Sequence, residues 1–381
     1  MVNDNRIIFV LSDSHYLYKD ILFKISKDLL SNKYYTIALV RSLNRDKQFI
    51  ETLKFYFSEV IVYGSDYYNY QINFKNNYFI NKYHFIKAIK SLKEELLNII
   101  NSLEVNIIIS FDSFDIANEV ISVFKKDIRI YYLQTSTLVA EIDDNTLRQK
   151  FDNFLCYIFC GFKLIRTSNN PPFNNKNLNY ILWTKLWANN INKNNYKINY
   201  LPMILSKDRV VKNYKRIKIK NVLVILNKKR NIGLENWKIY ANFYKSFFKE
   251  NKQYTPIFKV HPAEDYTFCS EYFSGYKVLK GKISLDTYDL VLAHWSTFIF
   301  DAALNWKPFI LINPKNSFDF KKWRLNHYPL LATEKFELSL MINKLEDDNE
   351  FFEKTVNDFL ITSLGDNLSA SLENLKKIIL K

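Results

Sequence analysis

The chain has 381 residues, a length that can hold two medium-sized domains, each with its own core. Hydrophobic residues make up 48% of it and charged residues 24%, which excludes a disordered chain. The net charge of +15 favours anionic partners such as nucleotides, acidic glycans, anionic lipid or nucleic acid, although the lysines are spread out without a long basic block.

Short apolar runs alternate with helical patterns through the first half of the chain. The predicted strands are 6–11, 35–40, 60–63, 105–110 and 128–133. The predicted helices among them are 18–30, 83–103 and 116–124. Because strands that alternate with helices of this length form parallel βαβ units, residues 1–167 are expected to form one Rossmann-like α/β domain.

The cysteines and the apolar runs indicate the cellular compartment in which the protein is expected. Cys156, Cys160 and Cys269 are odd in number and include no CxxC pair, so neither a disulfide framework nor a zinc site is expected. The first two lie in an apolar run and are expected in the core. The run at 7–11 is too short for a signal peptide, and 154–165 is too short to span a bilayer. We therefore expect a cytoplasmic protein, with a charge compatible with peripheral attachment to an anionic membrane surface at the inner face of the cytoplasmic membrane.

The second half begins after a change in composition. Asn-rich runs surround one short predicted helix, 181–188, so residues 168–220 are interpreted as an interdomain region. The second Rossmann-like domain, 221–381, opens with a predicted strand at 222–226 and a helix at 237–249. The chain has six glycines and neither a GxGxxG sequence nor a P-loop, which argues against a dinucleotide-binding enzyme or a P-loop NTPase.

The most informative stretch of this second domain runs from Pro256 to Pro314. In order, it contains a predicted strand (257–260), His261-Pro262, a strand (290–293), Ser296-Thr297, a helix (298–304), Lys307-Pro308 and a strand (309–312). Ligands of open α/β sheets bind where parallel strands end, and a helix start offers N–H groups and a positive dipole end to a phosphate. The stretch therefore predicts a site for the phosphate of a nucleotide-linked donor.

These motifs resemble those of GT-B glycosyltransferases of the bacterial sialyltransferase and polysialyltransferase type, which use CMP-sugars. There is weaker similarity to Kdo transferases and CDP-glycerol glycerophosphotransferases. The shared pattern is a strand ending in His-Pro, a Ser-Ser or Ser-Thr pair at the next helix start, and Lys-Pro before a strand. The resemblance implies two Rossmann-like domains whose parallel sheets face each other across a cleft, the first on the acceptor side and the second on the donor side.

The resemblance also implies roles for the donor-side residues. His261, followed by Pro262, would contact the donor phosphate and assist departure of the leaving group, and Ser296 and Thr297 would bind the same phosphate. Such donors would stabilise the charge that develops on a departing CMP. The alternative is a capping histidine with an ordinary N-cap Ser or Thr.

Two more side chains are candidates for donor binding. His294 lies two positions before Ser296 in the same turn. Arg230 ends a basic run that follows the first strand of the second domain, a loop that otherwise forms a solvated basic turn.

The acceptor base has several candidates in the first domain. Sialyltransferases of this type carry an acidic pair followed by glycine, and Asp143-Asp144 followed by Asn145 is the nearest match. The glycine is missing, and the pair lies beyond the predicted strand 128–133 instead of directly after it. The competing carboxylates are Asp13, Asp112 and Asp115. Asp13 follows the first predicted strand, where Kdo transferases place a base.

We expect an inverting glycosyltransferase that needs neither metal nor cofactor, because the sequence shows no cluster with metal-ligand spacing. The predicted donor is a CMP-activated acidic sugar (sialic acid, another nonulosonate or Kdo), and the acceptor is a surface glycan such as lipooligosaccharide or capsule. One alternative is the same fold with a UDP-sugar or a CDP-linked group. Another is a non-catalytic protein that binds nucleic acid or a membrane surface. Nucleic acid is not expected, because no basic stripe with interleaved aromatics is visible. The oligomeric state stays open.

Overall fold

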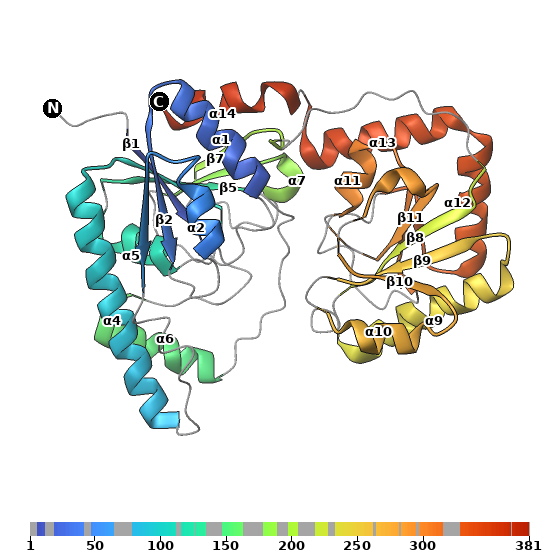
Figure 1. Ribbon diagram of the computed structural model, residues 1–381, viewed down its shortest axis with the longest axis horizontal. Helices are drawn as coiled ribbons and strands as arrows, with labels where there is room; N and C mark the ends of the chain where they lie inside the picture. The colour runs from blue at the N-terminus through green and yellow to red at the C-terminus, as the bar shows by residue number, and fades with distance from the viewer. Residues whose placement is uncertain are drawn as a thin grey trace. The chain divides into compact units, whose positions relative to one another are not determined.

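The computed structural model describes most of the chain. The described residues are 6–11, 19–41, 47–64, 78–111, 116–125, 127–134, 147–162, 178–188, 197–204, 218–227, 233–261, 264–281, 283–294, 296, 298–314, 328–366 and 368–380. They fall into two compact units (Figure 1). Unit 1 consists of Met1–Ser206 together with Asn367–Lys381, and unit 2 is Lys207–Asp366.

Unit 1 contains a seven-stranded sheet in the described part of the chain, with strand order β3-β2-β1-β4-β5-β6-β7. Its strands are β1 (Arg6–Leu11), β2 (Tyr35–Arg41), β3 (Glu59–Tyr63), β4 (Ile107–Ser110), β5 (Arg129–Leu133), β6 (Leu178–Leu182) and β7 (Lys197–Tyr200). All neighbouring strands are parallel. The central strands are continuous apolar runs because both faces of a parallel sheet are covered, and Ile7 to Leu11 of β1 are buried accordingly.

The described helices of unit 1 lie between these strands and at the end of the chain. They are α1 (Lys19–Ser31), α2 (Lys47–Leu53), α4 (Tyr78–Leu103), α5 (Ile116–Phe124), α6 (Leu147–Cys160), α7 (Lys185–Ala188), the short 3-10 helix η6 (Leu368–Ala370) and α14 (Ser371–Ile379). The core beneath α1 combines Leu22, Ile25 and Leu29 of that helix with Phe9 and Leu11 of β1. The same helical spacing of apolar residues predicted this helix from the sequence.

The last helix of the chain belongs to unit 1, although unit 2 precedes it in sequence. Leu375 and Ile379 of α14 are buried in the core of unit 1. Lys376 forms an ion pair with Asp28 of α1 at 3.3 Å, and the Tyr131 hydroxyl donates to the Ile378 carbonyl at 3.3 Å. Figure 1 shows the red C-terminal helix beside the blue α1. The first and last segments of the chain therefore stabilise the same unit.

Unit 2 contains a six-stranded parallel sheet in its described part, with order β10-β9-β8-β11-β12-β13. Its strands are β8 (Asn221–Ile225), β9 (Thr255–Lys259), β10 (Lys277–Leu279), β11 (Leu290–Ala293), β12 (Phe309–Ile312) and β13 (Leu331–Ala332). Its helices are α9 (Leu234–Glu250), α10 (Tyr266–Tyr272), the 3-10 helix η3 (Leu285–Thr287), α11 (Phe298–Leu304), α12 (Lys335–Asp347) and α13 (Asn349–Leu364). The prediction of two parallel α/β domains is confirmed.

The structure divides the chain differently from the sequence interpretation. The predicted interdomain region 168–220 contains β6 and β7, which extend the first sheet. The predicted helix 181–188 is wrong in its first part, because Ile181 and Leu182 are strand residues and only Lys185–Ala188 is helical. The predicted second domain 221–381 includes α14, which packs in unit 1. Cys156 and Cys160 are buried, as expected of core residues, and Cys269 is buried as well.

Candidate functional site

The candidate site lies at the carboxyl edge of the second sheet, where the strand order reverses. β8 is the first strand of unit 2 and lies between β9 and β11, so successive crossovers leave it in opposite directions. Ile225 at the end of β8 is in register with Lys259 of β9 and with Ala293 of β11. Open α/β sheets bind ligands at such a switch point, outside the carboxyl ends of the strands. Asn227, His261 and His294 all follow these three strand ends.

A buried polar cluster lies beneath this switch point. The Asn227 side-chain nitrogen is 2.8 Å from Nδ1 of His294, and the Tyr240 ring of α9 packs on the His294 ring with centroids 4.0 Å apart. The Tyr240 hydroxyl donates to Oδ1 of Asn313, which follows β12, at 3.2 Å. The indole of Trp237 donates to the Asn227 carbonyl at 3.1 Å. Polar side chains that follow three strands are thus fixed in one network.

His294 is an interior member of this network. Its exposed fraction is 2%, and burial lowers the pKa of the imidazole to about 3. The ring is therefore neutral at physiological pH and cannot offer a positive charge to a phosphate. The sequence placed His294 in contact with the donor, whereas its position suits a residue that orients Asn227 and the turn after β11.

His261 is exposed at the end of the segment that follows β9. Its carbonyl accepts a hydrogen bond from the Glu264 N–H at 2.9 Å, which closes a tight turn. Asp265 then caps α10 by accepting from the Phe268 N–H at 3.3 Å. The neighbouring carboxylates thus shape the turn, and the His261 side chain is left at the surface of the carboxyl edge.

Ser296 stands at the start of α11. Its hydroxyl oxygen accepts from the Phe298 N–H at 3.2 Å, and its carbonyl accepts from the Ile299 N–H at 3.1 Å. The contact is of the capping type that the sequence left open as an alternative, and α11 itself begins two residues later, at Phe298. A hydroxyl at this position still lies close to the first N–H groups of the helix, so the two roles can be combined in one residue.

Lys259 is a residue that the sequence analysis did not single out. It ends β9 and is half-buried, and burial lowers the pKa of its ammonium group. Its Nζ lies 5.8 Å from the centroid of the Phe298 ring, at the start of α11. The Lys259 ammonium group on β9 thus lies near the start of α11, although α11 follows β11, two strands away in the sheet. The sequence feature that could have identified Lys259 is a single charged residue at the end of an otherwise apolar strand.

The motif lysine has a different position. Nζ of Lys307 donates to the carbonyl oxygen of Tyr288 at 2.9 Å. Tyr288 precedes β11, so this contact lies at the amino end of the strand, away from His261 and Ser296. Lys307 therefore ties the amino ends of β11 and β12 together.

The remaining predicted site residues lie outside the described residues. They are Asp13, Asp143, Asp144, Arg230, Pro262 and Thr297, together with the competing carboxylates Asp112 and Asp115. Their roles stay predictions. The strands before two of them end at Leu11 and Ser110, and these strands are neighbours at the switch point of the first sheet.

The position directly after β5 is structural. Gln134 is buried, its side-chain oxygen accepts from the Trp183 N–H at 2.9 Å, and its carbonyl accepts from the Trp183 indole at 2.8 Å. Gln134 thus joins the ends of β5 and β6.

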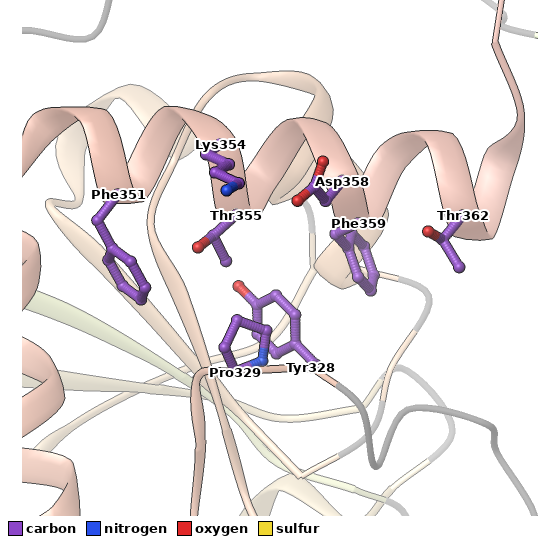
Figure 2. A pocket seen from close by; sticks show the side chains of 8 residues that line it. All are labelled: Tyr328, Pro329, Phe351, Lys354, Thr355, Asp358, Phe359 and Thr362. Atoms are coloured by element: carbon purple, nitrogen blue, oxygen red, sulfur yellow. The ribbon is translucent and has the colours of Figure 1, made fainter.

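Unit 2 also has a pocket of about 390 Å³ beside α13 (Figure 2). Tyr328 and Pro329 line one side of it, and Lys354, Thr355 and Asp358 of α13 line the other. The Tyr328 hydroxyl donates to the carbonyl of Phe309, the first residue of β12, at 3.0 Å. The pocket therefore lies toward the amino ends of the strands, the edge at which open α/β sheets do not bind their ligands.

Among the described residues, no group of three or more His, Cys, Asp or Glu side chains could hold a metal ion. Nor does any helix in the described ranges have the length and apolar character needed to cross a bilayer.

The fold is similar to those of solved structures, although no protein-family model and no curated protein matches the chain. The glycotransferase of kitacinnamycin matches with a TM-score of 0.59 at 10% identity, over 99% of both chains. The UDP-GlcNAc 2-epimerase from Neisseria meningitidis bound to UDP-GlcNAc matches at 0.56 and 11%, over 98% of this chain and 100% of that one. Phytolacca americana UGT2, complexed with UDP-2fluoro-glucose and pterostilbene, matches at 0.55 and 12%, over 98% of both. These identities establish the fold alone, which is the predicted GT-B architecture.

Proposed function

We propose that the protein is a glycosyltransferase that uses a nucleotide-activated sugar, with the nucleotide phosphate bound at the carboxyl edge of the second sheet. The observation that carries this proposal is the convergence of Lys259, His261 and Ser296 on that edge, next to the switch point between β8 and β11. Fixed hydrogen-bond donors and a cation at this point would stabilise the charge on a departing nucleotide.

The donor that the comparisons support best is a UDP-sugar. Two solved structures with the same fold hold a UDP-sugar or an analogue of one, and both match nearly the whole chain. This support favours the UDP-sugar alternative over the CMP-sugar that the sequence motifs predicted.

A CMP-activated acidic sugar is the second candidate, and a specific observation favours it. His261-Pro262 follows β9 and Ser296-Thr297 precedes α11, in the order that resembles CMP-dependent sialyltransferases. In either case an acidic residue of unit 1, with Asp143, Asp144 and Asp13 as candidates, would take the proton of the acceptor hydroxyl. Capsule and lipooligosaccharide remain the proposed acceptor classes.

The experiment is a donor screen read by mass spectrometry. Purified protein is incubated with UDP-sugars and CMP-sugars, each with and without oligosaccharide acceptors. We expect a glycosylated product with one nucleotide class, and a loss of rate of ~10²–10³ in His261→Ala, as for other transition-state donors. His84→Ala, which removes an exposed histidine of unit 1, is the control. Epimerised donor without any transfer would reject the transferase proposal in favour of an epimerase.

A further inference from the structure

Helix α6 is apolar on two opposite sides. Cys156 and Cys160 on its inner side are buried. The large apolar side chains on its outer side are exposed by 45 to 58%: Phe151, Phe154, Tyr157, Ile158 and Phe159. A helix on the surface of a globular protein normally carries polar residues on its outer side. An exposed apolar patch of this kind marks an interaction surface.

The exposed residues form a stripe at helical spacing. Phe151, Phe154 and Ile158 are separated by three and then four positions, so they lie along one face of α6. Tyr157 and Phe159 widen this face on either side. Four of the five side chains are aromatic, and aromatic rings are the apolar groups that favour the boundary between lipid headgroups and acyl chains.

A positively charged helix lies next to this stripe. α4 packs against α6 (Figure 1). Nζ of Lys93 donates to the Cys160 carbonyl at 3.0 Å. Lys90, one turn earlier on α4, is exposed, and so is Lys87. Residues 78–93 of α4 contain four lysines and no acidic residue. α4, which packs against α6, is thus basic through Lys93, and Glu94 and Glu95 follow directly.

We propose that the outer face of α6, with Lys87 and Lys90 of α4, docks the protein on an anionic lipid bilayer. The apolar side chains would enter the interface, and the lysines would meet the negative headgroups. The combination of an aromatic-rich apolar stripe with exposed lysines on the neighbouring helix favours a bilayer over a second protein surface, which would have to match both features. The surface is formed by unit 1, so the proposal does not depend on which nucleotide unit 2 binds.

The test is flotation of the full-length chain with vesicles. One set of vesicles is pure phosphatidylcholine and the other contains 30 mol% phosphatidylglycerol, a fraction set at roughly the anionic content that attracts basic surfaces. We expect binding to the anionic vesicles that weakens with salt. Phe154→Asp/Ile158→Asp should lower partitioning at least about tenfold, since two large apolar groups are lost from the interface. Lys87→Glu/Lys90→Glu should lower it at least about fivefold on anionic vesicles.

Matched control variants distinguish a specific effect of the α6 face from a general effect of added negative charge or lost apolar surface. Phe336→Asp/Leu340→Asp alters two exposed apolar residues of α12 with the same spacing, and should bind like the wild type. Lys252→Glu/Lys277→Glu changes the net charge equally at exposed positions of unit 2. All altered side chains are exposed, so melting temperatures should stay within a few degrees, and circular dichroism checks this.

Three results would overturn the proposal. The first is wild-type protein that does not float with anionic vesicles. The second is Phe154→Asp/Ile158→Asp protein that floats as well as the wild type. The third is a wild-type dimer in light scattering that becomes a monomer in this variant without any vesicle binding, which would make the α6 face an interface between copies of the chain.

Discussion

The side-chain nitrogen of Asn227 lies 2.8 Å from Nδ1 of His294, and this contact joins the ends of β8 and β11. These two strands flank the point at which the order of the second sheet reverses. The contact is mostly buried, and Tyr240 extends it to Asn313. The contact holds the ends of these two strands together beneath the candidate site, to which His261 and Ser296 are contributed by separate turns.

The buried imidazole predicts a dependence of stability on pH. Burial lowers the pKa of His294 to about 3, so the unfolded chain binds a proton at this site below about pH 6.5 while the folded chain does not. Stability therefore falls as pH decreases, and His294 alone should cost about 2 kcal/mol between pH 7 and pH 5. His294→Gln should flatten this part of the profile in denaturant titrations. An unchanged slope in His294→Gln would contradict the assignment.

The packing of α14 in unit 1 predicts that a substitution in this last helix destabilises unit 1, most of which lies far away in sequence. Leu375 is 1% exposed in the core of unit 1. Leu375→Ala should lower the free energy of unfolding of unit 1 by about 2–5 kcal/mol, because it removes buried methyl groups and leaves a cavity. Lys377→Ala, at an exposed position of the same helix, is the control. Hydrogen exchange of β1 amides should report the loss, and unchanged protection there would show that α14 is not part of this core.

Lys259 predicts an effect on nucleotide affinity. A half-buried ammonium beside the start of α11 is placed to meet a phosphate oxygen, and a hydrogen bond to a charged group contributes ~1.5–3 kcal/mol. Lys259→Met should therefore weaken UDP or CMP binding by roughly tenfold or more in calorimetry. Lys277→Met, at an exposed position of β10, should not change it. Equal affinities for the two variants would remove Lys259 from the site.

The fold of the second unit was largely predictable from sequence, because its elements are marked by local patterns of apolar residues. β11, α11 and β12 have the bounds that their apolar runs predicted, because each run is buried and ends at polar turn residues. β7 was missed because an edge strand buries little, and its residues Lys197 to Tyr200 are exposed or half-buried. No local pattern marks it as a strand.

The rest of the site depends on contacts between distant segments. The burial of His294 depends on Asn227 and Tyr240, 67 and 54 positions away, and no spacing in the sequence reveals it. The sequence predicted a polar turn after β11 and a direct contact of His294 with the donor, but it could not predict the burial of His294. In the same way, α14 shows a clear helical pattern but nothing that says which unit it joins.

The acceptor base is predicted within unit 1. Asp143→Asn or Asp144→Asn should lower turnover ~10²-fold or more with donor affinity little changed, since a general base contributes to the chemical step. Asp13→Asn should do less, and Asp347→Asn, at an exposed position of unit 2, should have no effect. The reverse order would transfer the role to Asp13. Full activity in all three would direct attention to Asp112 and Asp115.

The most direct test of the donor site is calorimetry of UDP and CMP with wild-type protein and with Ser296→Ala/Thr297→Ala. Ser296 accepts a hydrogen bond from Phe298, the first residue of α11, whose ring lies near the Lys259 ammonium, so the loss of both hydroxyls should weaken binding of the preferred nucleotide by at least about tenfold. Ser339→Ala/Thr362→Ala, which removes two hydroxyls from α12 and α13, should bind the nucleotide like the wild type. An unchanged nucleotide affinity in Ser296→Ala/Thr297→Ala would place the phosphate elsewhere and contradict the account.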